Sequence, residues 1–169
     1  KELRDKTGAG MMDCKNALLE NDGDLDSATS WLRKKGIANA DKKSSRTASE
    51  GLVGLKINEK ISVIVEVNTE TDFVSKNEDF QNYVSKVLDI CSSKKLTIDE
   101  LLMQNYDESC NVAESLKNLI AKIGENIVIR RLVYLTNDDE QYVFGGYIHN
   151  KINTKLGKMA CVTKLKTNV

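Results

Sequence analysis

Three carboxylates occur close together in one short stretch of the chain: Glu66, Glu70 and Asp72. Residues at even positions of an extended strand share a face, so these side chains could point the same way. A pair of carboxylates is the equipment of a glycoside hydrolase. Such an enzyme usually needs a cleft rich in aromatic residues, which make up only 5% of this chain. We therefore keep hydrolysis as a minor hypothesis.

The same stretch places a large apolar residue, Phe73, directly after the acidic Asp72. A β-branched run at residues 61–65 predicts a buried strand just before the pair, and a helical pattern begins soon after it. A strand-to-helix corner of this kind projects side chains beyond the sheet. Two interpretations stay open: Phe73 folds back and caps the core, or Asp72 and Phe73 are presented to a pocket in a partner protein.

Motifs of other chemistries are missing from the sequence. It contains no G-x-x-x-x-G-K-[ST] loop and no G-x-G-x-x-G after a strand, so we expect the chain itself to bind no nucleotide phosphate. One histidine, His149, leaves little for a nucleophilic triad. The four cysteines form no C-x-x-C pair, so we expect no metal site. Together with the missing motifs above, this leads us to expect no cofactor and no catalytic residue in this chain. Three of them lie among apolar residues and should be reduced and packed: Cys14, Cys91 and Cys161.

The elements that must hold the corner begin with a hairpin. Residues 52–57 and 61–68 predict two strands joined by a turn at residues 58–60, and alternate residues of the second strand face a core. Beyond the corner, Asn77 is a candidate N-cap for an amphipathic helix. Its apolar residues fall at helical spacing: Phe80, Tyr83, Val84, Val87, Leu88 and Cys91.

Two more helices and three more strands follow. A capping-box sequence starts a short helix at residue 97, and an amphipathic helix at residues 112–123 is closed by Gly124. Strands are predicted at residues 127–135, 142–149 and 158–165.

Strands, then helices, then strands favour an α+β fold, an antiparallel sheet with helices on one face. A hairpin turn is predicted at residues 137–140, between the third and fourth strands. Gly145 and Gly146 fall inside a strand pattern and predict a bulge.

The amino-terminal part predicts a miniature bundle of three helices. Helical patterns cover residues 1–6 and 11–20, and a third helix begins after Asp24 and ends at Gly36. Because a bundle of this size is only marginally stable alone, we expect it to gain stability from a partner. A stretch of polar and small residues then predicts a linker. The chain is thus divided into a three-helix domain at 1–40, a linker at 41–50 and an α+β core at 51–169.

Met11 and Met12 open the second helix. Successive helical residues lie about 100° apart, so the two side chains cannot share one face. Met11 has apolar spacing with Cys14, and if Met11 packs inward, Met12 is left at least partly exposed. Either both methionines wrap around a tiny core, or they form an adaptable binding patch.

The charge balance limits the classes of partner. Lys and Arg number 25 and Asp and Glu number 25, so the chain has no net charge with which to bind nucleic acid generally. No apolar run approaches the length of a membrane span, and no signal peptide is recognisable. The sequence begins at Lys1, so we expect an upstream piece to be missing or removed.

Two stretches match signatures of one protein family. Residues 3–18, LRDKTGAGMMDCKNAL, and residues 66–76, EVNTETDFVSK, resemble the two signatures of translation elongation factor Ts. Residues 123–126 and 147–149 also resemble landmarks of that family, so the resemblance spans nearly the whole chain.

The resemblance implies a guanine-nucleotide exchange factor that releases GDP from elongation factor Tu, whether Tu is met in its GDP-bound or its nucleotide-free state. The first three helices would form a ubiquitin-associated-like (UBA-like) domain that contacts the partner's nucleotide-binding domain. The second signature implies that the aromatic side chain enters a pocket near the partner's magnesium site, supported by the neighbouring carboxylate. Carried over by position, the contacts would be Arg4, Met11, Met12, Asp72 and Phe73, with Thr71 and Val74 beside the pair.

Many family members continue into a second core subdomain, and no further helical module follows Leu165. We therefore expect contacts with a distant domain of the partner to be absent. The resemblance also implies a bacterial cytoplasm or a mitochondrial matrix, with no direct contact to nucleic acid or membrane. The alternative function is a UBA-like module that binds ubiquitin or a peptide on a scaffold domain, which leaves the corner at Phe73 unexplained.

Overall fold

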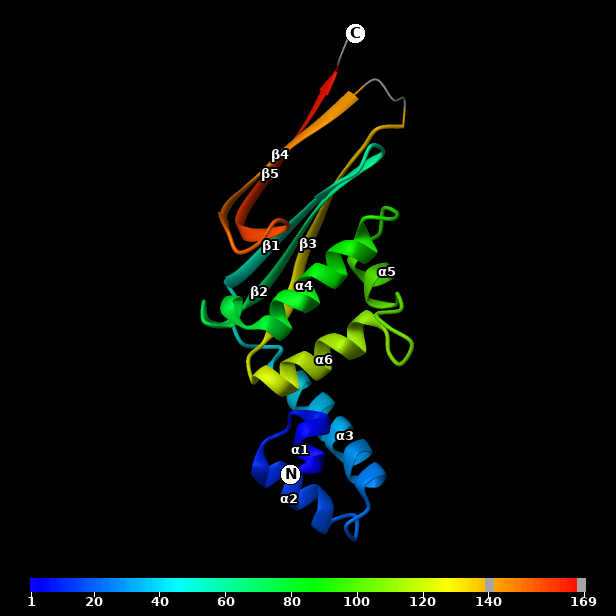
Figure 1. Ribbon diagram of the computed structural model, residues 1–169, viewed down its shortest axis with the longest axis vertical. Helices are drawn as coiled ribbons and strands as arrows, with labels where there is room; N and C mark the ends of the chain where they lie inside the picture. The colour runs from blue at the N-terminus through cyan, green and yellow to red at the C-terminus, as the bar shows by residue number, and fades with distance from the viewer. Residues whose placement is uncertain (139–141, 167–169) are drawn as a thin grey trace.

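Figure 1 shows the computed structural model of the protein as an elongated molecule, with three helices at one end and a two-stranded ribbon at the other. Helices and a sheet pack together between these ends. The structure describes residues 1–138 and 142–166, apart from the side chain of Ile37.

The three amino-terminal helices are α1 (Glu2–Thr7), α2 (Met11–Leu19) and α3 (Leu25–Lys43). α1 ends at the left-handed Gly8, and α3 begins at Asp24, whose carboxylate accepts a hydrogen bond from the backbone N–H of Ser27 at 2.7 Å. The three helices enclose a small separate core made of Leu3, Cys14, Ala17, Ala28 and Leu32.

The end predicted for the third helix at Gly36 is wrong, because α3 continues without a break to Lys43. Its second half packs against α6 (Val112–Ile123), and a Cβ on Gly36 would come within 3.0 Å of the Cβ of Ala121. Glycine here allows a close approach between helices and does not end one. Salt bridges flank this contact, Arg33–Glu114 at 3.3 Å and Asp41–Lys117 at 3.0 Å. The division of the chain at residues 40 and 50 stays a prediction.

The sheet has five antiparallel strands in the order β3-β2-β1-β5-β4. The predicted α+β class and the hairpin between the first two strands are confirmed. The bounds of the strands are β1 Glu50–Ile57, β2 Ile61–Thr69, β3 Ile127–Thr136, β4 Tyr142–Lys151 and β5 Leu156–Lys166.

The predicted hairpin between the third and fourth strands is wrong, because β3 pairs with β2 and β4 pairs with β5, at opposite ends of the sheet. Residues 139 and 140 of the predicted turn lie outside the described part of the chain. Turn-forming residues indicate where a chain changes direction, but not which strands become neighbours. Asn137 instead joins distant parts, since its side chain donates hydrogen bonds to the carbonyls of Tyr142 and Glu59.

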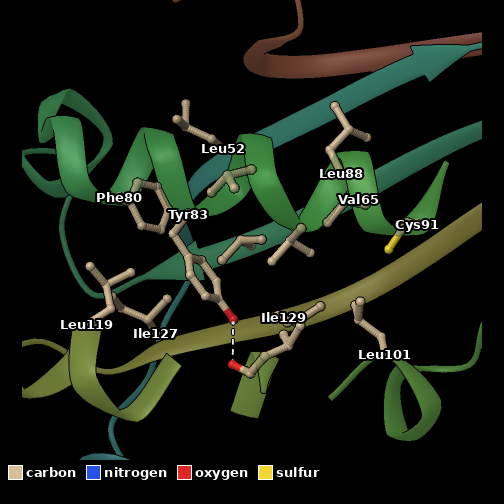
Figure 2. Close-up of a cluster of buried hydrophobic side chains, with 14 of the residues drawn as sticks. Leu52, Val65, Phe80, Tyr83, Leu88, Cys91, Leu101, Leu119, Ile127 and Ile129 are labelled. Carbon is tan, nitrogen blue, oxygen red and sulfur yellow. Dashed lines mark hydrogen bonds between the residues drawn. The ribbon is translucent and has the colours of Figure 1, made fainter. Parts of the chain in front are cut away.

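One face of the sheet is covered by α4 (Glu78–Cys91), α5 (Ile98–Leu102) and α6, as Figure 1 shows. The six apolar residues predicted to line α4 are all buried, and Figure 2 shows Phe80, Tyr83, Leu88 and Cys91 among the side chains of this core. The predicted N-cap at Asn77, the capping box at Thr97 and the left-handed end at Gly124 are also confirmed.

The β4–β5 hairpin joins the rest of the sheet through β5, whose start pairs with β1 at Val53–Gly157 and Gly54–Leu156. The bulge predicted at Gly145 and Gly146 is wrong, because their pairing with β5 runs in unbroken register. Gly146 lies so close to the side chains of β1 that an added Cβ would meet Ile57 at 2.6 Å. Small size, not an irregular ladder, explains this glycine.

Two of the three cysteines expected to be packed, Cys14 and Cys91, are buried. Cys161 is exposed on β5, so the expectation for this residue is wrong. Its neighbours are apolar in sequence, but several of the hairpin's apolar side chains are themselves exposed: Val143, Tyr147, Met159 and Leu165.

Candidate functional site

The corner between β2 and α4 is closed by a short 3₁₀ turn, η1 (Val74–Lys76). Ser75 donates from its backbone N–H and its hydroxyl to the carbonyl of Asp72, at 3.2 and 2.5 Å. The backbone N–H of Lys76 donates to the carbonyl of Phe73 at 3.1 Å. These bonds tie down the backbone of the pair, so its conformation does not depend on where the two side chains point.

The side chains of Phe73 and Val74 lie in opposite environments. Phe73 is 76% exposed, whereas Val74 is 6% exposed and belongs to the main core. The interpretation that Phe73 folds back to cap the core is therefore wrong, because Val74 occupies that position. Asp72 is exposed as well, so the corner presents an aromatic ring beside a carboxylate.

Thr71 anchors the corner from inside and is partly buried. Its backbone N–H donates to one carboxylate oxygen of Glu125 at 2.9 Å, and its hydroxyl donates to the other at 2.6 Å. The carbonyl of Thr71 accepts a hydrogen bond from the hydroxyl of Thr69 at 2.8 Å. Of the four predicted residues 71–74, the outer two are thus held in the protein and the middle two face solvent.

The three carboxylates that suggested hydrolysis have separate surroundings. Glu66 binds the side chains of Arg131 and Asn68. Glu70 accepts a hydrogen bond from the backbone N–H of Asn126 at 2.6 Å and lies 3.4 Å from the guanidinium of Arg46, and Asp72 is exposed. The arrangement braces a loop and does not aim paired carboxylates at one substrate, so it gives the hydrolase hypothesis no support.

The amino-terminal helices carry a second exposed apolar patch. Met11 is 70% exposed and Met12 is 64% exposed, so the interpretation that both methionines wrap around a small core is wrong. Both lie in the first turn of α2, where Cys14 and Ala17 already fill the inner face. Arg4 on α1 is exposed too, so all three residues carried over to this module are accessible.

Two residues that hold the corner were not predicted to have this role. Glu125 and Asn126 follow the end of α6, and Asn126 is buried with only 2% of its surface exposed. Their sequence signal was a pair of polar residues between a closing glycine and a buried strand. That position favours side chains that bind neighbouring backbone, but it does not name the neighbour.

The part of the chain that the structure describes holds no cluster of three or more His, Cys, Asp or Glu side chains placed to bind a metal ion. Among the helices of that part, none has both the length and the apolarity needed to cross a bilayer.

The chain is similar to proteins of one family along nearly its whole length. The family model described as Elongation factor TS matches residues 70–169. Elongation factor Ts of Rhizobium johnstonii is 48% identical over 168 residues, which is 99% of this chain and 54% of that protein. The proteins of the same name from Brucella anthropi (48% identical) and Methylocella silvestris (46%) are matched over the same shares, 99% of this chain and 54% of theirs. The chain thus spans about half the length of the curated relatives it matches, and it belongs to the elongation factor Ts family.

Proposed function

We propose that this chain is a guanine-nucleotide exchange factor that promotes release of GDP from elongation factor Tu during translation elongation. The observation that carries the proposal is the exposure of Phe73, 76%, beside the exposed Asp72 on a corner that is braced from within. A large aromatic ring that a well-ordered backbone holds in solvent favours binding to a partner, because the free energy of burying the ring is gained only when the complex forms.

The proposed mechanism needs no covalent chemistry by this chain. In a GTP-binding partner, Mg²⁺ bridges the nucleotide phosphates and the protein. Phe73 enters a pocket near that site and displaces groups that support the metal, and Asp72 stabilises the rearranged partner. By linkage, if the exchange factor lowers the partner's affinity for GDP, then bound GDP lowers the partner's affinity for the exchange factor by the same ratio.

The amino-terminal helices supply the second contact in this proposal. Arg4, Met11 and Met12 bind the partner's nucleotide-binding domain, with the exposed methionines forming an adaptable apolar patch. We also propose that these helices form a UBA-like domain. A ubiquitin- or peptide-binding function for that domain remains the less favoured candidate, because it gives the exposed ring of Phe73 no task.

Release of a fluorescent GDP analogue from purified elongation factor Tu tests the proposal by stopped flow. Adding the chain should raise the release rate with its concentration until the rate saturates. Phe73→Ala should cost about 2 kcal/mol or more of partner binding, and Asp72→Asn should cost less because it keeps size and some hydrogen bonding. Chelating Mg²⁺ should partly mask both defects. Release that stays at the intrinsic rate at every concentration of the chain would contradict the proposal.

A companion experiment concerns the chain alone. Calorimetric titration with GDP and with GTP should show no binding, because no glycine loop in the sequence cradles phosphates. Micromolar binding by the isolated chain would mean that any effect on release reflects competition for nucleotide. We place this activity where elongation factor Tu works, in a bacterial cytoplasm or a mitochondrial matrix.

A further inference from the structure

The two residues after α6 connect segments that are far apart in the sequence. α6 ends at Gly124, which has a left-handed φ of 90°, and Glu125 and Asn126 follow before β3 begins. Glu125 binds the corner that carries Phe73, and Asn126 binds both that corner and the segment after α3. This short turn therefore contacts the segments that hold two exposed patches: the Asp72–Phe73 corner, and the amino-terminal helices that carry Met11 and Met12.

The contact between Glu125 and Thr71 uses both oxygens of a partly buried carboxylate, at 2.9 and 2.6 Å. Hydrogen bonds to an ionised group are about twice as strong as neutral ones, and a two-point contact fixes direction as well as distance. Thr71 immediately precedes Asp72, so this contact determines where the presented pair begins.

The contacts of Asn126 extend the connection to the amino-terminal helices. Its backbone N–H donates to Glu70 at 2.6 Å, and its side-chain amide donates to the carbonyl of Arg46 at 2.7 Å and more weakly to that of Ser44 at 3.4 Å. The guanidinium of Arg46 lies 3.4 Å from Glu70 and closes the group. Because Asn126 is 2% exposed, water cannot easily replace these partners.

We infer that Glu125 and Asn126 are positioning residues, which hold the Asp72–Phe73 corner and the end of α3 in one fixed relation so that both exposed patches meet the partner together. The inference rests on the proposed exchange function. Neither residue needs to touch the partner, since Asn126 is buried and both carboxylate oxygens of Glu125 are occupied by Thr71. Their contribution is pre-organisation, which reduces the ordering that binding would otherwise require.

Variants of Glu125 test the first half of the inference. Glu125→Ala removes both acceptors and should lower the release rate at saturating chain by about tenfold or more. Glu125→Gln should restore the rate to within about twofold, because its oxygen can accept from the Thr71 N–H while its amide donates to the threonine hydroxyl. The matched control is Asn111→Ala, a change at the other end of α6. It removes the N-cap side chain that accepts a hydrogen bond from the backbone N–H of Glu114 at 2.8 Å, and it should leave the saturating release rate unchanged.

Asn126→Ala tests the second half through a different quantity. It should raise the chain concentration needed for half-maximal release more than it lowers the saturating rate. The reason is that the amino-terminal helices are then no longer held in the right position relative to the Asp72–Phe73 corner. Thermal unfolding of every variant shows whether it is folded at the assay temperature. A folded Glu125→Ala chain with a normal saturating rate would overturn the inference, as would equal losses in Glu125→Ala and Asn111→Ala. A wild-type chain that accelerates nothing would instead defeat the proposed function itself.

Discussion

Phe73 and Phe80 lie seven positions apart and have opposite environments: the ring of Phe73 is 76% exposed, and that of Phe80 is fully buried, at 0%. The 3₁₀ turn and the N-cap Asn77 separate them, so the chain passes from a presented side chain to a core side chain within one corner. The same substitution at these two positions therefore distinguishes binding from stability.

Phe73→Ala should change the free energy of unfolding by no more than about 0.5 kcal/mol, as expected for an exposed site. Phe80→Ala should cost about 3–5 kcal/mol, because it leaves a cavity in the core. Urea unfolding measures both values, and stopped-flow release from elongation factor Tu measures the function of each folded variant. A strongly destabilised Phe73→Ala chain that still accelerates release normally would contradict the presented role of the ring.

Replacing both exposed methionines tests the amino-terminal contact. The double variant Met11→Ser, Met12→Ser should leave unfolding nearly unchanged and raise the concentration for half-maximal release by about tenfold. The control is Leu19→Ser at the other end of α2, where the side chain is 69% exposed. Equal effects at both ends would mean that general surface hydrophobicity, and not this patch, drives binding. Point variants are preferable to deleting residues 1–40, because Ala40 packs in the main core.

Acid should weaken the tie between α4 and the sheet. Asp89 is partly buried, which raises its pKa, but hydrogen bonds from Lys56 at 2.7 Å and Lys155 at 3.1 Å outweigh that effect and bring the pKa below its ordinary value of 3.8. A lowered pKa in the folded state means that the contribution to stability is complete above 3.8 and is lost as the pH falls through the folded value.

The stability difference between wild type and Asp89→Asn should therefore be constant from neutral pH down to about 5 and shrink below 3.8. Urea unfolding at a series of pH values measures it. Lys155→Gln, which leaves Lys56 in place, should show a smaller change of the same sign. A difference that persists unchanged in strong acid would show that Asp89 acts through packing alone.

The cysteines should react in the order of their exposure. Cys161 is exposed, whereas Cys91 is fully buried and burial raises its pKa to about 11, so its thiol stays protonated at neutral pH. Because the thiolate is the reactive form, iodoacetamide should label Cys161 first and Cys91 only after unfolding. Mass spectrometry of timed samples gives the order, and Cys161→Ser should remove the fast phase. Labelling of Cys91 as fast as Cys161 in the folded chain would refute the assigned burial.

Local sequence patterns predicted the helices of the core well. The apolar spacing of α4, the N-cap Asn77, the capping box at Thr97 and the closing Gly124 all act within a few residues, so each could be recognised without knowing the fold. The pair Asp72 and Phe73 was also found as a candidate site. Its exposure could not be predicted, because that depends on Val74 occupying the core beneath it.

What the sequence could not supply are contacts between distant elements. Gly36 continues a helix because α6 packs beside it, and β4 pairs with β5 instead of β3. Met11 is exposed because smaller residues already fill the core of its module. The bonds from Thr71 to Glu125 span 54 positions, and no local pattern indicates such a pair.

The unbroken course of α3 to Lys43 changes how two binding patches can cooperate. At about 1.5 Å per residue, its 19 residues form a rod about 28 Å long, whose first half lines the amino-terminal core and whose second half packs against α6. Patches on a flexible tether meet a second site at an effective concentration set by the tether's random motion. Two patches joined by a rigid rod cannot search in this way. After one patch has bound, the other either meets its site on the partner or cannot reach it. Under the proposed exchange function, we therefore expect the chain to select partners by the distance between the two sites that receive these patches.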